Sequence, residues 1–321
     1  MGDQDEGHGK PGEGAGGEDR RGFLKCMAWA GTGALWTVSG GLASSVGLDQ
    51  AMAKPAAATG FSFLQLSDSH VGFAKPANPD AAATYREAVA KVAALPVKPD
   101  FILHTGDITQ LSRDQEFDDA EQIVRQAGLT VFHVPGEHDM LDEGAGKAYL
   151  DRFGKGTRGA GWYSFDHKGV HFVALVNVVN LKAGGMGSLG AEQLAWLEKD
   201  LAARPASTPI VVFAHIPLWT VYADWGWGTD DAAQALTYLR RFGSVTVLNG
   251  HIHQITRKVE GHIAFHTARS TAFPQPVGGQ GPSPGPLKVP TEQLHSMLGI
   301  TTATFVRGAE PIALVDATLA S

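Results

Sequence analysis

The chain has 321 residues, of which 43% are hydrophobic and 18% are charged, so it is long enough to bury a sizeable core. Its formal net charge of −7 and the lack of a Lys- or Arg-rich run argue against a protein that grips nucleic acid through the phosphates. The single cysteine, Cys26, excludes intramolecular disulfides and cysteine-based metal cages. Any bound metal would therefore have oxygen and nitrogen ligands.

The first 53 residues differ in kind from the rest. Residues 1–19 are Gly-rich and acidic, without apolar periodicity, and are predicted to be disordered. Arg20 and Arg21 then precede a soft apolar stretch that ends in the small-x-small sequence at 51–53. This pattern resembles a twin-arginine export signal, which predicts passage through the twin-arginine translocation machinery and a periplasmic or secreted mature chain. A membrane anchor or a surface helix is the alternative, but the interrupting glycines suit neither, and we expect no stable membrane anchor.

Residues 54–321 are predicted to form the folded domain, in which strands and helices alternate. Short apolar runs predict buried strands at 61–66, 101–103, 131–134, 210–213 and 245–248. Helical spacing predicts helices through 85–92, 117–124, 194–201 and 233–241, the first with Asn78 as N-cap and Pro79 in its first turn. Hairpins are predicted at 162–176 and 254–268. The Pro/Gly-rich segment 273–290 is predicted to be an ordered loop or a flexible flap.

Mixed strand order with hairpins predicts the fold class. We expect an α/β fold in which two mixed sheets face each other and helices flank both, a four-layer αββα sandwich.

Each of the five predicted strands stops in a turn that carries acidic or histidine side chains. In open α/β sheets the crevice beyond the strand ends is where ligands sit, and a strand end is a rigid platform. Five such turns can aim oxygen and nitrogen atoms at one point. The sequence therefore predicts a two-metal hydrolytic centre.

Taken in order, these turns resemble the motifs of the calcineurin-like metallophosphoesterases. The motifs are Asp-x-His, Gly-Asp, Gly-x-His-Asp, a lone His after a strand and Gly-His-x-His, and the resemblance covers residues 61–268. It implies a first metal held by Asp68, His70, Asp107 and His253. It also implies a second metal, bridged by Asp107 and held by Glu137, His215 and His251.

The resemblance further implies the chemistry. Hard carboxylates with imidazoles suit two ions of the Mn, Fe or Zn type, and a hydroxide bridging them would be the nucleophile. His138 is the candidate general acid or transition-state donor, and Asp139 is expected to orient it through its other ring nitrogen.

Each residue also has a structural interpretation. A lone His such as His215 is more often a hydrogen-bonded structural group, Asp107 could cap a turn, and Asp68 could cap a helix. None of these explains five recurrences. Histidines without this turn context are assigned to structure or surface: His104, His133, His167, His171, His262 and His266.

One residue departs from the family pattern, because Glu137 stands where the family has Asn. An ionised Glu only accepts hydrogen bonds and leaves the centre with one fewer positive charge. Two hypotheses follow: a monoanionic diester is favoured over a dianionic monoester, or Fe(III) in one site restores the charge.

The sequence thus predicts a dinuclear metal-dependent phosphoester hydrolase that acts on a small phosphodiester, such as a cyclic nucleotide or a lipid-derived ester. Alternatives are a phosphomonoesterase or nucleotidase, and a metal-binding protein without hydrolytic activity. The aromatic segment 219–227 either stacks on a leaving group or packs its own small core. Arg269 and Ser270 either contact phosphate oxygens or lie at the surface.

Overall fold

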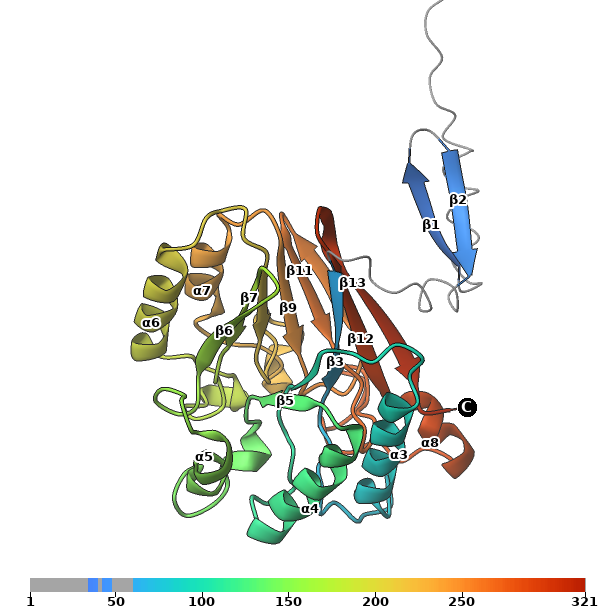
Figure 1. Cartoon of the computed structure of the whole chain (residues 1–321). Helices are drawn as coiled ribbons and strands as arrows, with labels where there is room; N and C mark the ends of the chain where they lie inside the picture. The colour runs from blue at the N-terminus through green and yellow to red at the C-terminus, as the bar shows by residue number, and fades with distance from the viewer. Residues whose placement is uncertain (1–33, 40–41, 48–59, 321) are drawn as a thin grey trace, which may run out of the picture. The chain divides into compact units, whose positions relative to one another are not determined.

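The computed structural model describes residues 34–39, 42–47 and 60–320 (Figure 1). The chain divides into two compact units, Met1–Pro55 and Ala56–Ser321. In the first unit, strand β1 (Ala34–Ser39) pairs antiparallel with β2 (Leu42–Gly47). The arginine pair and the small-x-small sequence of the predicted export signal lie outside the described residues. Within the described residues, no helix has both the length and the apolar character to cross a bilayer.

The second unit contains two mixed sheets. The five-stranded sheet has the order β13-β12-β3-β4-β5 and the six-stranded sheet the order β10-β11-β9-β8-β7-β6. The strands of the first are β3 (Gly60–Leu66), β4 (Phe101–His104), β5 (Thr130–His133), β12 (Gly299–Val306) and β13 (Ala309–Thr318). Those of the second are β6 (Tyr163–His167), β7 (Val170–Ala174), β8 (Ile210–Phe213), β9 (Val245–Asn249), β10 (Arg257–Glu260) and β11 (Ile263–Thr267).

Helices cover the outer face of each sheet (Figure 1). Buried side chains of α3 (Ala81–Ala93), α4 (Asp114–Val124) and α8 (Thr291–Met297) pack with the five-stranded sheet. Those of α6 (Ala191–Ala202) and α7 (Ala232–Leu239) pack with the six-stranded sheet. The expected four-layer αββα sandwich is confirmed.

Alternation along β3 shows how the sequence specifies these layers. Phe61 and Phe63 belong to the cluster between the sheets, whereas Leu64 and Leu66 belong to the cluster under the helices. This is the period of two that a strand with two buried faces requires. Phe63 also stacks on Phe101 at a centroid distance of 5.3 Å. Burial of each such ring stabilises the folded state by roughly 2–3 kcal/mol. The sheets therefore support the turns at their ends rigidly.

Most predicted elements are present, but the start of α3 is not where the sequence placed it. The N-cap is Asp80, whose carboxylate accepts a hydrogen bond from the amide of Ala83. The prediction that Asn78 caps the helix is wrong, because its amide is buried and donates instead to the carbonyl of Ala272 at 2.6 Å. The sequence also missed α5 (Lys147–Phe153), α8 and the β12-β13 hairpin.

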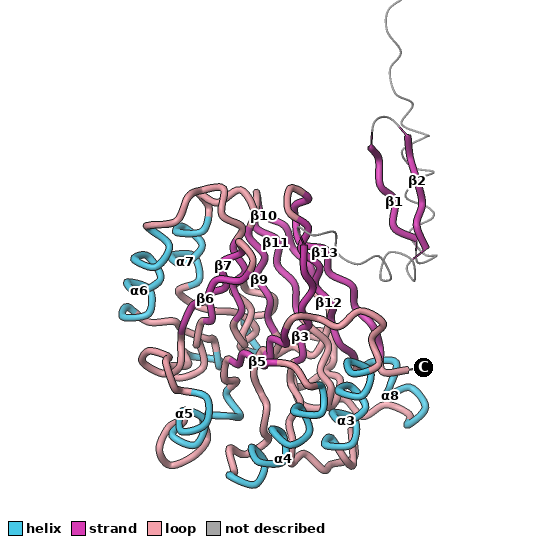
Figure 2. The backbone as a smooth tube through the Cα atoms, viewed as in Figure 1, coloured by secondary structure: helices cyan, strands magenta, loops and turns pink. Residues whose placement is uncertain are grey.

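The parallel strands bring the important turns to one end of the molecule. In one sheet β3, β4 and β5 are parallel, and in the other β7, β8, β9 and β11 are parallel. The loops that follow these strands are long (Figure 2). All of the predicted ligand-bearing turns are among them.

Candidate metal centre

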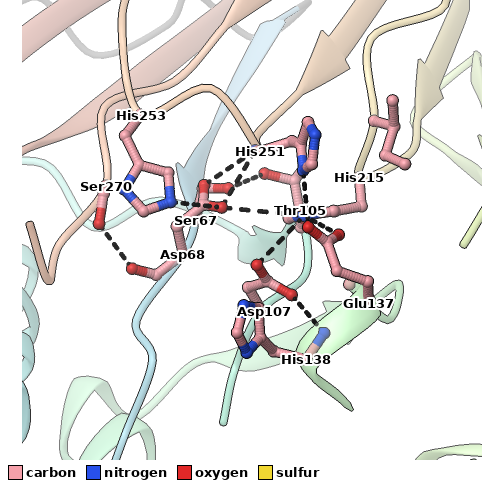
Figure 3. A network of polar contacts seen from close by, with 12 residues as sticks. Ser67, Asp68, Thr105, Asp107, Glu137, His138, His215, His251, His253 and Ser270 are labelled. Atoms are coloured by element: carbon pink, nitrogen blue, oxygen red, sulfur yellow. Dashed lines mark hydrogen bonds and ion pairs between the residues drawn. The ribbon is translucent and has the colours of Figure 1, made fainter. Parts of the chain in front are cut away.

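The structure brings the predicted ligand side chains together in one cluster (Figure 3). Within this cluster, three groups of three residues each have ligand atoms that all lie within 4.8 Å of one another. These groups are Asp68-His70-His253, Asp68-Asp107-His215 and Glu137-His215-His251. The same distance criterion also groups His138 with His70 and Asp107.

Asp107 lies between two halves of the cluster. Its Oδ2 is 3.5 Å from Nε2 of His70 and 3.4 Å from Nε2 of His215. On one side, Nε2 of His253 lies 3.2 Å from Oδ1 of Asp68. On the other, the carboxylate of Glu137 reaches His215 at 2.9 Å. The geometry therefore offers two adjacent donor sets that share one carboxylate.

The turns that carry these side chains adopt an uncommon backbone conformation. Positive φ angles occur at Asp68 (52°), His70 (41°), Asp107 (52°), His251 (71°) and His253 (53°). Such conformations cost of order 1–3 kcal/mol each for a residue with a Cβ atom and cluster at functional sites. Here they occur directly after β3, β4 and β9, where the chain turns sharply into the cluster.

Gly136 is required by close packing within the cluster. A Cβ atom at this position would lie 2.0 Å from Oδ1 of Asp107 and 2.3 Å from its amide nitrogen. Gly136 itself has φ −94°, so sterics rather than backbone conformation impose the glycine. The absence of a side chain lets the Glu137 turn approach Asp107.

Backbone carbonyls fix the orientation of two imidazoles. Nδ1 of His215 hydrogen-bonds the carbonyl of Thr105 at 2.7 Å, and Nδ1 of His253 bonds that of Phe273 at 2.6 Å. A carbonyl only accepts, so Nδ1 is the protonated nitrogen in each ring. Nε2 of both residues then faces the cluster, as a ligand nitrogen must. These contacts could not be predicted from the sequence, because any residue can supply a carbonyl.

The carboxylates of the cluster are anionic. Burial disfavours the charged form of Asp68, but His253 and then His215 outweigh it and hold the pKa below its ordinary value. Burial likewise acts against Glu137, and His251 and His215 hold its pKa well below its ordinary value. For His215, burial lowers the pKa but Asp107 and Glu137 raise it well above the ordinary value. Without cations, the proton that Asp107 and Glu137 stabilise on His215 therefore offsets part of the carboxylate charge.

Four buried atoms of the cluster residues have no hydrogen-bond partner within the described residues: Nε2 of His215, Oε2 of Glu137, Nδ1 of His70 and Nε2 of His251. A buried polar atom without a partner is costly, and a cation bound by Nε2 of His215 and Oε2 of Glu137 would satisfy both of those atoms. The donor set of three carboxylates and four imidazoles also matches the preference of Mn, Fe and Zn. The residues present therefore fit two metal ions.

His138 is held by a group other than the expected one. Its Nδ1 hydrogen-bonds the carbonyl of Gln110 at 2.8 Å, which leaves Nε2 as the nitrogen that can face a substrate. Burial lowers the pKa of His138, but Asp107 and Glu137 outweigh burial and raise it above the ordinary value.

The prediction that Asp139 orients the ring of His138 is wrong. The Asp139 carboxylate accepts hydrogen bonds from the amides of Gly136 and Ile108 at 3.0 Å and from the amide and hydroxyl of Thr109. All of these donors belong to two turns. The carboxylate therefore connects the Gly-Asp turn to the Glu137 turn. Burial and the charge of Asp107 raise the pKa of Asp139 to about 6. Its role is to brace the cluster.

The segments proposed for substrate contact pack mainly on the protein. Trp219 packs against Phe265, and Trp227 is buried beneath Trp225. The 219–227 segment thus packs partly within itself, at Trp225 and Trp227, and partly on β11 through Trp219. The phosphate contact proposed for Ser270 is wrong, because its buried hydroxyl donates to the carbonyl of Asp68 at 2.7 Å. The guanidinium of Arg269 donates to the carbonyls of residues 296 and 297.

The six histidines that the sequence assigned to structure or surface lie outside the cluster. His104 is buried behind it and pairs with the hydroxyl of Ser69 at 3.0 Å. His133 stacks on Phe153. Others pair with carboxylates in structural contacts: His167 with Asp100, His171 with Asp166 and Asp200, and His266 with Asp316. His262 is exposed.

Comparison with known families decides what this arrangement belongs to. The sequence profile of the family described as calcineurin-like phosphoesterase matches residues 61–255, more than half of the chain. The chain belongs to the calcineurin-like phosphoesterase family. Its His/Asp cluster is suited to two metal ions.

Individual relatives are distant. The chain is 24% identical over 187 residues to a "Probable cyclic nucleotide phosphodiesterase" of Psychrobacter sp. (strain PRwf-1), covering 55% of this chain and 53% of the relative. It is 25% identical over 219 residues to a protein of the same name from Rhodococcus erythropolis, covering 63% and 68%. The chain thus spans about half the length of the first of these relatives. A dimetal phosphatase from Danio rerio shares the fold, with a TM-score of 0.58, 14% identity and coverage of 81% and 98%.

Proposed function

We propose that this phosphoesterase is a dinuclear, metal-dependent phosphodiesterase of small phosphoesters. The observation that carries the proposal is the position of Asp107, whose Oδ2 lies 3.5 Å from His70 and 3.4 Å from His215 and so belongs to both donor sets. Two bound cations would supply Lewis-acid activation of a water molecule and of the phosphoryl oxygens. The names of the Psychrobacter and Rhodococcus relatives support a diester substrate.

The protein groups divide the work by charge and position. Asp68 and Glu137 lie on opposite sides of Asp107, so each donor set contains one carboxylate of its own and one that is shared. Asp139 holds the two turns in register through its backbone hydrogen bonds. His138, whose Nδ1 is held by Gln110, can deliver a proton from Nε2 to the leaving oxygen.

Glu137 favours a diester over a monoester. A carboxylate in place of the family's amide lowers the net charge of the metal-loaded centre by one. The electrostatic attraction of the centre for a dianionic monoester then falls more than its attraction for a monoanionic diester. The ions are of the Mn, Fe or Zn type, and Fe(III) in one donor set would restore the charge.

The test is an ester panel combined with metal analysis. Protein loaded with Mn, Fe or Zn should cleave bis-nitrophenyl phosphate with a higher kcat/KM than nitrophenyl phosphate. Much faster cleavage of the monoester would replace the proposal with a monoesterase or nucleotidase. An inactive protein that gains activity in the Glu137→Asn variant would favour a non-hydrolytic role. Active protein that contains only divalent ions would remove the Fe(III) assignment.

Export through the twin-arginine pathway is a separate proposal, supported by Arg20, Arg21 and the small-x-small sequence at 51–53. It predicts mature protein in the periplasmic or secreted fraction of the cell. The double variant Arg20→Lys, Arg21→Lys should stay in the cytoplasm at full length. Equal export of this variant and the wild type would reject the proposal.

A further inference from the structure

Exposed large hydrophobic side chains gather at the end of the domain that carries the metal centre. Among the described residues, seven such side chains are more than a third exposed. Five of them lie on loops that follow the strands ending at the metal centre: Leu111 (43%), Leu141 (55%), Val179 (41%), Leu181 (44%) and Val277 (54%). We call these five residues the apolar rim. Scattered exposed apolar residues are normal, but a concentration around one site marks a binding surface.

The topology explains the placement. Leu111 follows β4, Leu141 follows β5, and both strands run parallel to β3. Val179 and Leu181 follow β7, which is parallel to β8. Val277 follows β11, which is parallel to β9. All five residues are therefore at the carboxyl ends of the strands.

The two remaining exposed residues lie elsewhere. Val306 ends β12, where it pairs with Gly60, the first residue of β3, so it is at the opposite end of the sheet. Val259 lies within β10 and pairs with Ala264 near the start of β11. These two valines provide matched controls.

Hydrogen bonds connect the rim directly to the ligand-bearing turns. The hydroxyl of Ser112, next to Leu111, donates to the carbonyl of His138 at 2.8 Å and accepts from the amide of Leu141 at 2.8 Å. Leu111 and Leu141 therefore flank the His138 turn.

The other loops are tied in the same way. Asn177 lies two residues before Val179, and its side-chain amide donates to the carbonyl of Ile216, which follows His215. Gln254 follows His253, and its side-chain amide donates at 2.7 Å to the carbonyl of Pro276, directly before Val277. The rim residues thus lie on loops that are hydrogen-bonded to the ligand-bearing turns.

The charges on these loops have both signs. Lys75 and Lys182 are exposed, and so are Glu143 and Asp224. Such a mixture gives no strong attraction to an anionic surface, in contrast to the basic clusters that recognise anionic lipids. An uncharged or zwitterionic apolar ligand fits better.

We propose that the substrate is an amphiphilic phosphodiester whose acyl or alkyl chains dock on the apolar rim while its phosphodiester group enters the metal centre. This inference rests on the proposed function and narrows its substrate class. Because the rim lies on the loops that carry or contact the ligand-bearing turns, the molecule that covers it is the substrate itself. A cyclic nucleotide, which has no apolar chain, would leave the rim uncovered.

The test compares diesters of equal head group and different chain length. Metal-loaded enzyme should cleave dioctanoyl phosphatidylcholine with a kcat/KM at least tenfold above that for dibutyryl phosphatidylcholine, and above that for cyclic AMP. The Leu141→Ser, Leu181→Ser double variant should lose most of this preference through a higher KM. The Val259→Ser, Val306→Ser double variant should retain it. A wild type without chain-length preference, or equal loss in both double variants, would overturn the proposal.

A binding measurement keeps the test independent of turnover. Wild-type protein should bind dodecylphosphocholine micelles, followed by tryptophan fluorescence, and the Leu141→Ser, Leu181→Ser variant should bind at least fivefold more weakly. Absence of micelle binding, or rim variants that instead change the oligomeric state, would contradict the proposal. Failure to hydrolyse bis-nitrophenyl phosphate together with normal micelle binding would count against the phosphodiesterase activity alone.

Discussion

Oε2 of Glu137 lies 2.9 Å from Nε2 of His215, and within the described residues neither atom makes a hydrogen bond. The other oxygen of Glu137 is 3.0 Å from Nδ1 of His251. The Glu137 carboxylate thus lies between the two imidazoles, with one oxygen within ion-pair distance of each. This is the arrangement expected of residues that share a cation, and it makes Glu137 the residue that distinguishes this centre from its family pattern.

Replacing Glu137 by Gln should weaken the second cation site. The amide keeps the volume but loses the negative charge, so we expect at least a tenfold loss of affinity for one of two Mn ions. Isothermal titration of the metal-free protein measures this directly. Glu143→Gln, an exposed carboxylate on the same segment, is the control and should bind as the wild type does. Equal affinities in the two variants would exclude Glu137 as a ligand.

Gly136→Ala should disrupt the shared carboxylate. The new Cβ atom would lie 2.0 Å from Oδ1 of Asp107, so either the carboxylate or the turn must move. Both donor sets use Asp107, and we expect the variant to bind neither ion tightly. Gly243→Ala is the control, because the atom nearest to its new Cβ, the carbonyl oxygen of Ala206, would lie 4.0 Å away. Metal content after dialysis separates the outcomes, and a fully loaded Gly136→Ala protein would contradict the assignment.

His138→Gln should reduce turnover without emptying the centre. Loss of a general acid costs typically 10²–10⁴ in kcat. The loss should be large for diesters with an alkyl leaving group and small for bis-nitrophenyl phosphate, whose leaving group needs no proton. The control is His262→Gln, on an exposed turn. If His138 were instead a metal ligand, the variant would lose metal, and both substrates would slow equally.

Much of the site could be predicted because its information is local. Each ligand follows an apolar strand, and a parallel sheet collects such strand ends, so the positions of Asp68, Asp107 and His215 after predicted strands indicated one site, and the family resemblance implied the two ligand sets. The role of Asp139 could not be predicted from the sequence. Its partners are backbone amides at 108 and 109, some 30 positions away, and an amide leaves no mark in the sequence.

The same limit explains other differences. The ring of Phe273 lies 4.7 Å from those of His70 and His253, yet its segment reads only as a Pro/Gly-rich loop. Asp80 rather than Asn78 caps α3, because Asn78 is needed for a contact with Ala272, 194 positions away. The sequence pattern identifies the secondary-structure elements and their ends. Contacts between distant segments determine the role of each polar residue.

Asp316 should make stability depend on pH. Burial raises its pKa, but a hydrogen bond and ion pair with His266, then Thr301 and Arg257, lower it to about 2. The stabilisation is complete above the unfolded-state pKa near 3.8 and is lost as the pH falls toward 2.

Asp316→Asn should therefore lower the free energy of unfolding by about 2 kcal/mol at pH 7. The difference from wild type should shrink below pH 4. Urea denaturation of metal-free protein at pH 7, 5 and 3 measures it, with the exposed Asp224→Asn as control. A difference that stays constant down to pH 3 would disprove the ion-pair explanation.

The most direct test of the dinuclear centre is anomalous diffraction from crystals grown with Mn. The account predicts two peaks per chain, about 3.5 Å apart. Asp107 should lie between them, with the other ligands divided into two sets: Asp68, His70 and His253, and Glu137, His215 and His251. No peak among these side chains, or one peak that leaves Glu137 and His215 without a metal, would contradict the account.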